Sequence, residues 1–193
     1  MCIRDRASAY RSFSRQLLIW NEKATGVRPV FDDKGQLLSV EQMTETDVVF
    51  AILRWSALPG GSRHHWGTDI DVYDRSAIAE GYAVQLNDTE VQLGGVFAPL
   101  HDWLDARIDN QQSHGFFRPY TSLPSTREAR LTGIAAERWH LSHQPSAEQF
   151  SQQLTLSKLY QVVEAQEDMQ LKKTVLAHFD EIFTTFISAS AIG

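Results

Sequence analysis

The sequence predicts an α+β fold in which helices pack against a small antiparallel sheet. Apolar residues recur at helical spacing in several segments, and short segments with strand-like alternation lie between them. This order of short strands and helices is typical of helices packed on one antiparallel sheet. The chain of 193 residues is long enough for one domain with a core and too short to predict two.

The composition argues against several classes of protein. The formal net charge of −6 argues against a nucleic acid as the main partner. No apolar run approaches the ~20 residues of a membrane-spanning helix, so no membrane span is predicted. Cys2 is the single cysteine, which excludes an intrachain disulfide and leaves the redox compartment open.

The N-terminal part is predicted to contain one helix after an irregular start. Residues 1–7 begin with basic side chains but are not followed by the apolar stretch of a signal peptide. We expect them to be foreign or disordered, with the N-terminal part of the protein truncated. From Tyr10 to Ala24, apolar residues recur on one face of a helix, and Gly26 and Pro29 end it.

The rest of the chain is predicted to alternate between helices and short strands. The predicted elements are a helix from Ser39 to just before Pro59, strands at 68–72 and 81–86, and a helix from 100 to 108. Residues 115–120 are aromatic and contain a proline, which predicts an edge strand or the lip of a cleft. Residues 122–132 are predicted to be a polar loop, and residues 145–193 a helical C-terminal tail.

Two segments are dense in side chains that bind metals. The first contains His64 and Asp71, and Gly67 lies between them, where a bend in the backbone lets both aim at one point. The second contains His140, with Glu137 three residues before it. A hydrolytic zinc site needs three protein ligands, an open position for water and a base that is not a ligand. The two segments can supply all four side chains.

These residues form patterns that resemble those of the VanY-like zinc D-alanyl-D-alanine carboxypeptidases, which have the hedgehog/DD-peptidase fold. The patterns are Ser62-x-His64-x-x-Gly67-x-x-x-Asp71, Glu137-x-Trp139-His140, and Ser8-Ala9-Tyr10-Arg11-Ser12 followed by Gln16. The resemblance implies that His64, Asp71 and His140 bind zinc. It also implies that Glu137 is the catalytic base, that Arg11 holds the terminal carboxylate of the substrate, and that Ser62 hydrogen-bonds near the substrate.

The resemblance implies a single zinc metallopeptidase domain over residues 1–193 that hydrolyses the terminal D-Ala-D-Ala bond of peptidoglycan stem peptides. A wall substrate implies the cell envelope or the periplasm. An L,D-carboxypeptidase or a wall endopeptidase with the same zinc site is the first alternative, and a non-catalytic zinc-containing wall-binding module is the second. Glu137 argues against the second, because a structural zinc site is usually closed by four protein ligands and needs no base. The oligomeric state stays open.

The neighbours of these residues leave further alternatives. Asp69 stands where the family commonly has a small residue, and alternation places it on the same strand face as Asp71. It is either a partner of a ligand or a rival ligand, and we favour Asp71 as the ligand. His65 is predicted to be a neighbour rather than a ligand. Arg118 and Tyr120 could line the cleft, although we favour positions on the surface.

Overall fold

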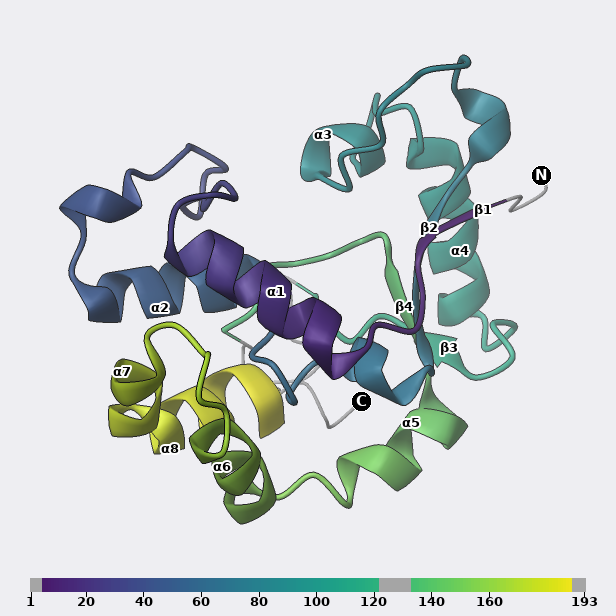
Figure 1. The fold of residues 1–193 in the computed structure, drawn as a ribbon. Helices are drawn as coiled ribbons and strands as arrows, with labels where there is room; N and C mark the ends of the chain where they lie inside the picture. The colour runs from purple at the N-terminus through teal and green to yellow at the C-terminus, as the bar shows by residue number, and fades with distance from the viewer. Residues whose placement is uncertain (1–4, 122–132, 189–193) are drawn as a thin grey trace.

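The computed structural model describes residues 5–121 and 133–188 and confirms the α+β class. The sheet is open and antiparallel, with the strand order β1-β2-β4-β3 (Figure 1). The strands are β1 (Asp5–Ser8), β2 (Asp69–Tyr73), β3 (Phe116–Phe117) and β4 (His140–His143). The central pair, β2 and β4, contains Asp69, Asp71 and His140. The aromatic β3 is an edge strand, as predicted for the proline-containing segment 115–120.

The helices gather mainly on one side of this sheet. Within the described residues they are α1 (Phe13–Ala24), α2 (Glu45–Trp55), α3 (Asp88–Val91), α4 (Ala98–Asp109), α5 (Gln144–Ser151), α6 (Leu156–Glu164), α7 (Lys172–Ala177) and α8 (Phe179–Ile182). A π-helical turn, Phe183–Ser188, continues α8. In Figure 1, α1, α2 and α6–α8 lie together on the left, and the sheet with α3 and α4 lies on the right. No helix in the described ranges is long and apolar enough to cross a membrane.

The main hydrophobic core lies among α1, α2 and the C-terminal helices. Its fully buried members include Trp20, Ile52, Val163 and Ile182. The indole nitrogen of Trp20 donates a hydrogen bond to the carbonyl of Gln170 at 2.9 Å, so its polar atom is satisfied inside the core. The helices α5–α8 and the π-helical turn lie in the segment predicted to be a helical tail, and they contribute about half of the buried residues of this core.

The second helix begins later than predicted. Its first residue is Glu45, and Thr44 is the N-cap, since the Thr44 hydroxyl accepts a hydrogen bond from the backbone of Asp47 at 3.2 Å. Ser39 precedes only a short 3-10 turn and makes no capping hydrogen bond. The prediction from Ser39 was wrong because two capping sequences lie five residues apart and only the second forms the bond.

The strand predicted at 81–86 was also wrong. The backbone N–H groups of Gln85 and Leu86 donate to the carboxylate of Glu90 at 3.0 and 2.7 Å. The φ angle of Leu86 is +52°, outside the extended region. This buried glutamate therefore takes the hydrogen bonds that a neighbouring strand would need and folds the segment into a loop.

The start of the chain is better ordered than predicted. Residues 5–8 form the edge strand β1, in which Ser8 lies opposite Asp71 of β2. The expectation of disorder over residues 1–7 is therefore wrong for residues 5–7, where backbone pairing with β2 supplies the order. The predicted polar loop at 122–132 lies outside the described residues.

A buried histidine in α4 predicts a loss of stability in acid. His101 is fully buried, and neither ring nitrogen has a hydrogen-bond partner among the described residues. Burial, together with the charges of Arg118 and Arg138, lowers the pKa of His101 to about 4. An unfolded histidine titrates near 6.5, so protonation favours the unfolded chain as the pH falls from about 6.5 to about 4.

Replacing His101 by leucine is expected to remove this loss. His101→Leu should raise the free energy of unfolding by about 1 kcal/mol at pH 7, because the substitution removes two unsatisfied buried nitrogens, and by more near pH 5. Thermal unfolding at a series of pH values measures both effects. If the melting temperatures of the two proteins stayed parallel between pH 7 and 4, His101 would not be the group responsible.

Candidate metal centre

Three potential metal ligands converge where β2 and β4 pair. Asp71 lies opposite His140 in the antiparallel register. His64 comes from the short 3-10 helix Arg63–Trp66, which ends at Gly67 with a φ angle of +71°, a conformation that favours glycine. One nitrogen or oxygen atom from each of His64, Asp71 and His140 lies within 4.8 Å of the others. The structure thus brings the three predicted ligands together.

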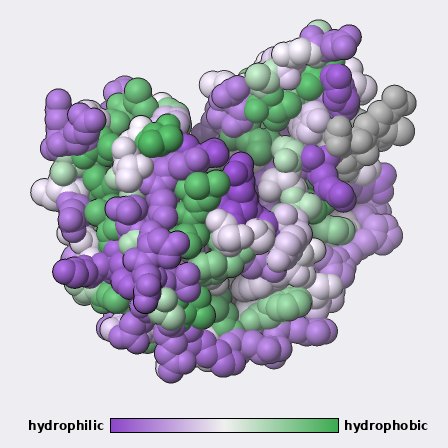
Figure 2. Space-filling model, viewed as in Figure 1, coloured by the Kyte–Doolittle hydropathy of each residue, from purple (hydrophilic) through white to green (hydrophobic). Residues whose placement is uncertain are grey.

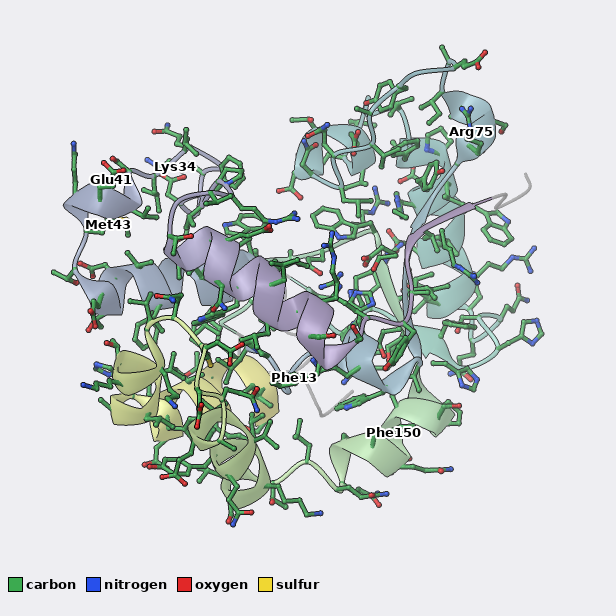
Figure 3. All side chains as sticks on the ribbon, in the orientation of Figure 1. Phe13, Lys34, Glu41, Met43, Arg75 and Phe150 are labelled. Atoms are coloured by element: carbon green, nitrogen blue, oxygen red, sulfur yellow. The ribbon has the colours of Figure 1, made fainter. Side chains whose placement is uncertain are left out.

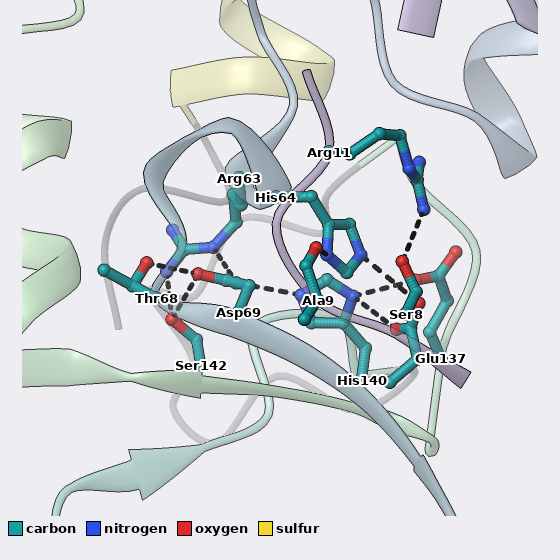
Figure 4. A network of polar contacts seen from close by, with 11 residues as sticks. Ser8, Ala9, Arg11, Arg63, His64, Thr68, Asp69, Glu137, His140 and Ser142 are labelled. Atoms are coloured by element: carbon teal, nitrogen blue, oxygen red, sulfur yellow. Dashed lines mark hydrogen bonds and ion pairs between the residues drawn. The ribbon is translucent and has the colours of Figure 1, made fainter. Parts of the chain in front are cut away.

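Each imidazole is fixed by a hydrogen bond on the side that faces away from the site (Figure 4). His64 donates from Nδ1 to the carbonyl of Ala9 at 2.8 Å. His140 donates from Nε2 to Oδ1 of Asp69 at 2.8 Å. Carbonyl and carboxylate oxygens only accept, so these two nitrogens carry protons. The other nitrogens, Nε2 of His64 and Nδ1 of His140, are therefore directed inward.

Both inward nitrogens face the carboxylate of Asp71. His64 Nε2 lies 3.3 Å from Oδ2, and His140 Nδ1 lies 3.2 Å from Oδ1. Oδ1 is buried and accepts no hydrogen bond from any described residue. Electron pairs that face one another at such distances repel unless a proton or a cation lies between them. Two imidazoles and a carboxylate are a common ligand set for zinc, so these residues fit the metal.

The pKa values of these groups agree with a site that attracts cations. Burial by itself disfavours a charged His140, but the neighbouring carboxylates of Asp69, Asp71 and Glu137 favour the protonated ring and raise its pKa well above the usual value. Burial likewise disfavours a charged Asp71, but the adjacent imidazoles of His140 and His64 hold its pKa well below the usual range. A metal ion competes with protons for these atoms, so its binding releases protons.

Asp69 orients the potential ligand His140 and does not compete with it. Burial would raise its pKa, but the bond to His140, the charge of Arg63 and the bond from Thr68 lower it to about 2, so it stays ionised. Arg63 Nε lies 2.9 Å from Oδ1, the Thr68 hydroxyl 2.6 Å from Oδ2, and the Ser142 hydroxyl 3.1 Å from Oδ2. Both oxygens are thus fully engaged, as Figure 4 shows. Between the two roles left open by the sequence, the geometry favours that of a carboxylate orienting His140.

Glu137 lies beside the three potential ligands. Its Oε2 is 3.4 Å from Nδ1 of His140, and its side chain is 15% exposed. The backbone holds it in place, because its N–H donates to the carbonyl of Tyr120 at 3.2 Å and its own carbonyl accepts from the N–H of His140 at 3.0 Å. Its carboxylate therefore stands at the edge of the site, within reach of a molecule held there.

Arg11 is positioned by a buried glutamine. Its Nη1 donates to Oε1 of Gln16 at 2.9 Å, and its Nη2 donates to the Ser8 hydroxyl at 3.2 Å. The amide nitrogen of Gln16 donates to the carbonyl of Ala57 at 2.7 Å, which fixes the orientation of the amide. The sequence pattern that contains Arg11 and Gln16 thus forms one unit that aims a guanidinium from the start of α1.

His65 holds the same segment through its backbone. Its Nδ1 donates to the carbonyl of Arg11 at 2.6 Å, and its Nε2 accepts from the N–H of Gly60 at 3.1 Å. The Arg11 N–H donates in turn to the carbonyl of His64 at 3.1 Å. Burial lowers the pKa of His65, which agrees with a neutral ring that has one donor and one acceptor. Both nitrogens are occupied, so His65 lies beside the site without facing it.

These groups surround one cavity of about 400 Å³ between the helical side and the sheet side of the molecule. Its lining includes Arg11, Lys23, Trp55, Ser62, His64, Asp71, Leu86, Asn87, Tyr120, Glu137, Trp139 and His140. In Figure 2 the surface is hollowed between the two sides. Ser62 is buried, and its hydroxyl caps no helix. All six predicted site residues therefore meet at this cavity.

The cavity also contains residues that the sequence had not placed there. Tyr120 is buried, with its ring centroid 4.8 Å from that of His140, so the preferred surface position was wrong. Lys23 also lines the cavity, although no sequence motif marked it. It follows Gln16 and Trp20 at helical spacing, and both of these are fully buried, so the same periodicity could have placed Lys23 toward the interior.

Aromatic residues brace the outer side of the 3-10 helix. Trp66 stacks on Phe150 of α5 with ring centroids 6.1 Å apart and planes at 11°. The Arg63 guanidinium lies 4.9 Å from the ring of Trp66. Figure 3 marks Phe150 on α5 and Phe13 at the start of α1, on either side of this helix. The packing limits the freedom of the segment that contains His64.

The two adjacent histidines are expected to differ in their effect on metal content. His64→Ala should lower the zinc retained after dialysis at least tenfold, because it removes one of three ligands. His65→Ala should leave zinc content within twofold of the unsubstituted protein, since both of its nitrogens contact the backbone. Metal analysis of the purified proteins measures this. Equal losses would mean that His65 is the ligand or that either change disrupts the fold, which circular dichroism would reveal.

The fold and the site together define a class of protein. An α+β domain with two histidines and an aspartate around one point, and a glutamate next to them, is typical of a hydrolase that uses a metal ion. The profile of the VanY D-alanyl-D-alanine carboxypeptidases matches residues 3–146. The chain belongs to this family, and it is a peptidase of the carboxypeptidase type.

Three proteins that resemble this chain share at most about a third of its residues over most of its length. An uncharacterised protein of Haemophilus influenzae is 30% identical over 130 residues, which cover 67% of this chain and 92% of that protein. A structure of VanYB in complex with D-alanine-D-alanine is 23% identical, covers 80% of this chain and 68% of that one, and has a TM-score of 0.44. The structure of the LdcB LD-carboxypeptidase is 21% identical, covers 79% and 60%, and has a TM-score of 0.39.

Proposed function

We propose that this protein is a zinc-dependent carboxypeptidase that hydrolyses the terminal D-Ala-D-Ala bond of peptidoglycan stem peptides in the cell envelope. The observation that carries the proposal is the convergence of two inward imidazole nitrogens, the Asp71 carboxylate, Glu137 and Arg11 on one cavity. Family membership supports the peptidase activity and the wall substrate. The cellular location follows from the substrate class.

His64, Asp71 and His140 would hold the zinc ion. When bound, zinc acidifies a water molecule and polarises the carbonyl of the scissile bond. Glu137 takes a proton from the attacking water and delivers it to the leaving amine, and its position 3.4 Å from His140 suits this role. Asp69 keeps His140 in one tautomer throughout, because its remaining hydrogen bonds anchor it from the other side.

Arg11 selects a free C-terminus. A guanidinium matches a carboxylate with two parallel hydrogen bonds, and the bond from Gln16 fixes the direction in which it points. Ser62 offers a buried hydroxyl at the cavity wall for a further hydrogen bond to the peptide. The combination favours removal of a single terminal residue over cleavage within a chain.

The test is to incubate the zinc-loaded protein with a stem pentapeptide and the corresponding tetrapeptide. Release of one D-alanine from the pentapeptide, with the tetrapeptide intact, is the expected result. Release from the tetrapeptide alone would favour an L,D-carboxypeptidase, and cleavage of cross-linked wall within its bridges would favour an endopeptidase. Absence of any cleavage by protein that has bound zinc would favour the non-catalytic binding module.

A further inference from the structure

Lys23 stands out among the charged residues of the cavity because the mechanism gives it no role. It lies in the last turn of α1, and its side chain lines the cavity together with Arg11 and Glu137. Its ammonium group makes no hydrogen bond or ion pair with any residue that the structure describes. Lys23 is half-buried. A cation that is partly removed from water without a partner lowers stability, so a partner from outside the protein would offset this cost.

The electrostatic surroundings of Lys23 leave room for an anion. Burial and the charge of Arg28 lower the pKa of Lys23, the charge of Glu137 raises it, and the charge of Arg11 lowers it again. Arg28 is itself paired with Glu22. The acidic groups that line the cavity in the described ranges, Asp71 and Glu137, lie beside His140. An incoming anion would therefore meet two cations on the side of α1.

The geometry of α1 separates Lys23 from the position of the terminal carboxylate. Arg11 precedes the first residue of the helix, whereas Lys23 lies about 15 Å along it, at 1.5 Å per residue. A peptide residue spans at most ~3.6 Å. The backbone distance of about 15 Å corresponds to about four extended residues, and the long side chain of Lys23 shortens this span. A peptide whose C-terminus contacts Arg11 thus reaches Lys23 with a group that lies two or more residues before its end.

We propose that Lys23 binds a second carboxylate of the substrate, located upstream of the scissile bond, and thereby selects stem peptides with an acidic group at that place. This inference rests on the proposed function and deepens it, because it names a feature of the peptide beyond its D-Ala-D-Ala end. The carboxylate can come from a diaminopimelate at the third position, where other stem peptides have lysine. It can also come from a γ-linked glutamate at the second position, where others have isoglutamine.

Four pentapeptides that combine these two choices test the proposal. Binding is measured by calorimetry with zinc-loaded protein that also has Glu137→Ala, so that no peptide is consumed. One carboxylate is expected to improve affinity about tenfold, and Lys23→Met should abolish this preference. Lys23→Arg should keep it, and so should Arg15→Met, which removes an exposed cation from the same helix. The position at which the carboxylate matters identifies its source.

The proposal fails if all four peptides bind the Lys23 protein equally, if none of them binds, or if the preference persists in Lys23→Met. The proposed function is tested separately, by measuring whether the unsubstituted protein hydrolyses these peptides. If all four peptides were cleaved and bound equally well, the protein would be a carboxypeptidase in which Lys23 does not select the substrate. If binding depended on Lys23 but no peptide were cleaved, Lys23 would select the ligand and the proposed carboxypeptidase activity would be wrong.

Discussion

Glu137→Gln is expected to lower the rate of D-alanine release by roughly 10³-fold while zinc content stays unchanged. Glutamine keeps the size of the side chain and its place beside His140, but it cannot accept a proton from water. General acid–base catalysis by a placed side chain is worth about 10²–10⁴-fold, and the effect here should lie within that range. The measurement is single-turnover release of D-alanine from a stem pentapeptide, with metal analysis of the same sample.

The matched control for this substitution is Glu148→Gln. Glu148 lies exposed on α5, so the same loss of charge there should leave the rate unchanged. If Glu137→Gln lost zinc as well as activity, Glu137 would have to be counted as a ligand, which its position outside the group of three closest donor atoms argues against. If the rate fell by less than tenfold, another group would be the base.

The local chemistry of the site could be predicted from the sequence, but its long-range pairing could not. The spacing of His64, Gly67 and Asp71 places two potential ligands around a tight turn, which a local pattern can encode. The juxtaposition of Asp71 with His140 depends on pairing between strands far apart in the chain. Periodicity carries no information on which strands become neighbours, and the resemblance to a family supplied that step.

The roles of Asp69 and Lys23 depend on orientations that a one-dimensional pattern leaves undetermined. Alternation placed Asp69 and Asp71 on one strand face. The orientation of the His140 ring decides their different roles. Its Nε2 bonds to Asp69, so its Nδ1 faces Asp71. For Lys23, helical spacing was sufficient to predict a position facing the interior, where its side chain is half-buried, but a lysine seldom takes such a position without a partner.

The errors in secondary structure share a physical cause. At Thr44 and at Glu90, side chains bond to nearby backbone N–H groups and thereby decide where regular structure begins or is excluded. Predictions from residue propensity and from the alternation of apolar residues do not take hydrogen bonds between side chains and the backbone into account. Thr44 competed with Ser39 for the start of α2, and Glu90 competed with a strand for the backbone of residues 85–86.

Arg11→Met is expected to reduce kcat/KM for pentapeptide hydrolysis by about 10²-fold, because loss of one partner from a buried charged pair costs about 2–5 kcal/mol. The methionine keeps much of the aliphatic stem and removes the guanidinium that Gln16 orients. KM should carry most of the change if the terminal carboxylate is bound equally in the ground state and the transition state. Steady-state kinetics over a range of peptide concentrations separates the two parameters.

A second variant and a modified substrate serve as controls for Arg11→Met. Arg11→Lys keeps the charge but loses the paired hydrogen bonds, so it should recover only part of the activity. A pentapeptide amide, which lacks the terminal carboxylate, should be hydrolysed poorly by the unsubstituted protein and no worse by Arg11→Met. If Arg11→Met cleaved the acid and the amide as well as the unsubstituted protein does, Arg11 would have no part in recognition. An endopeptidase, which does not require a free C-terminus, would then describe the site better than a carboxypeptidase.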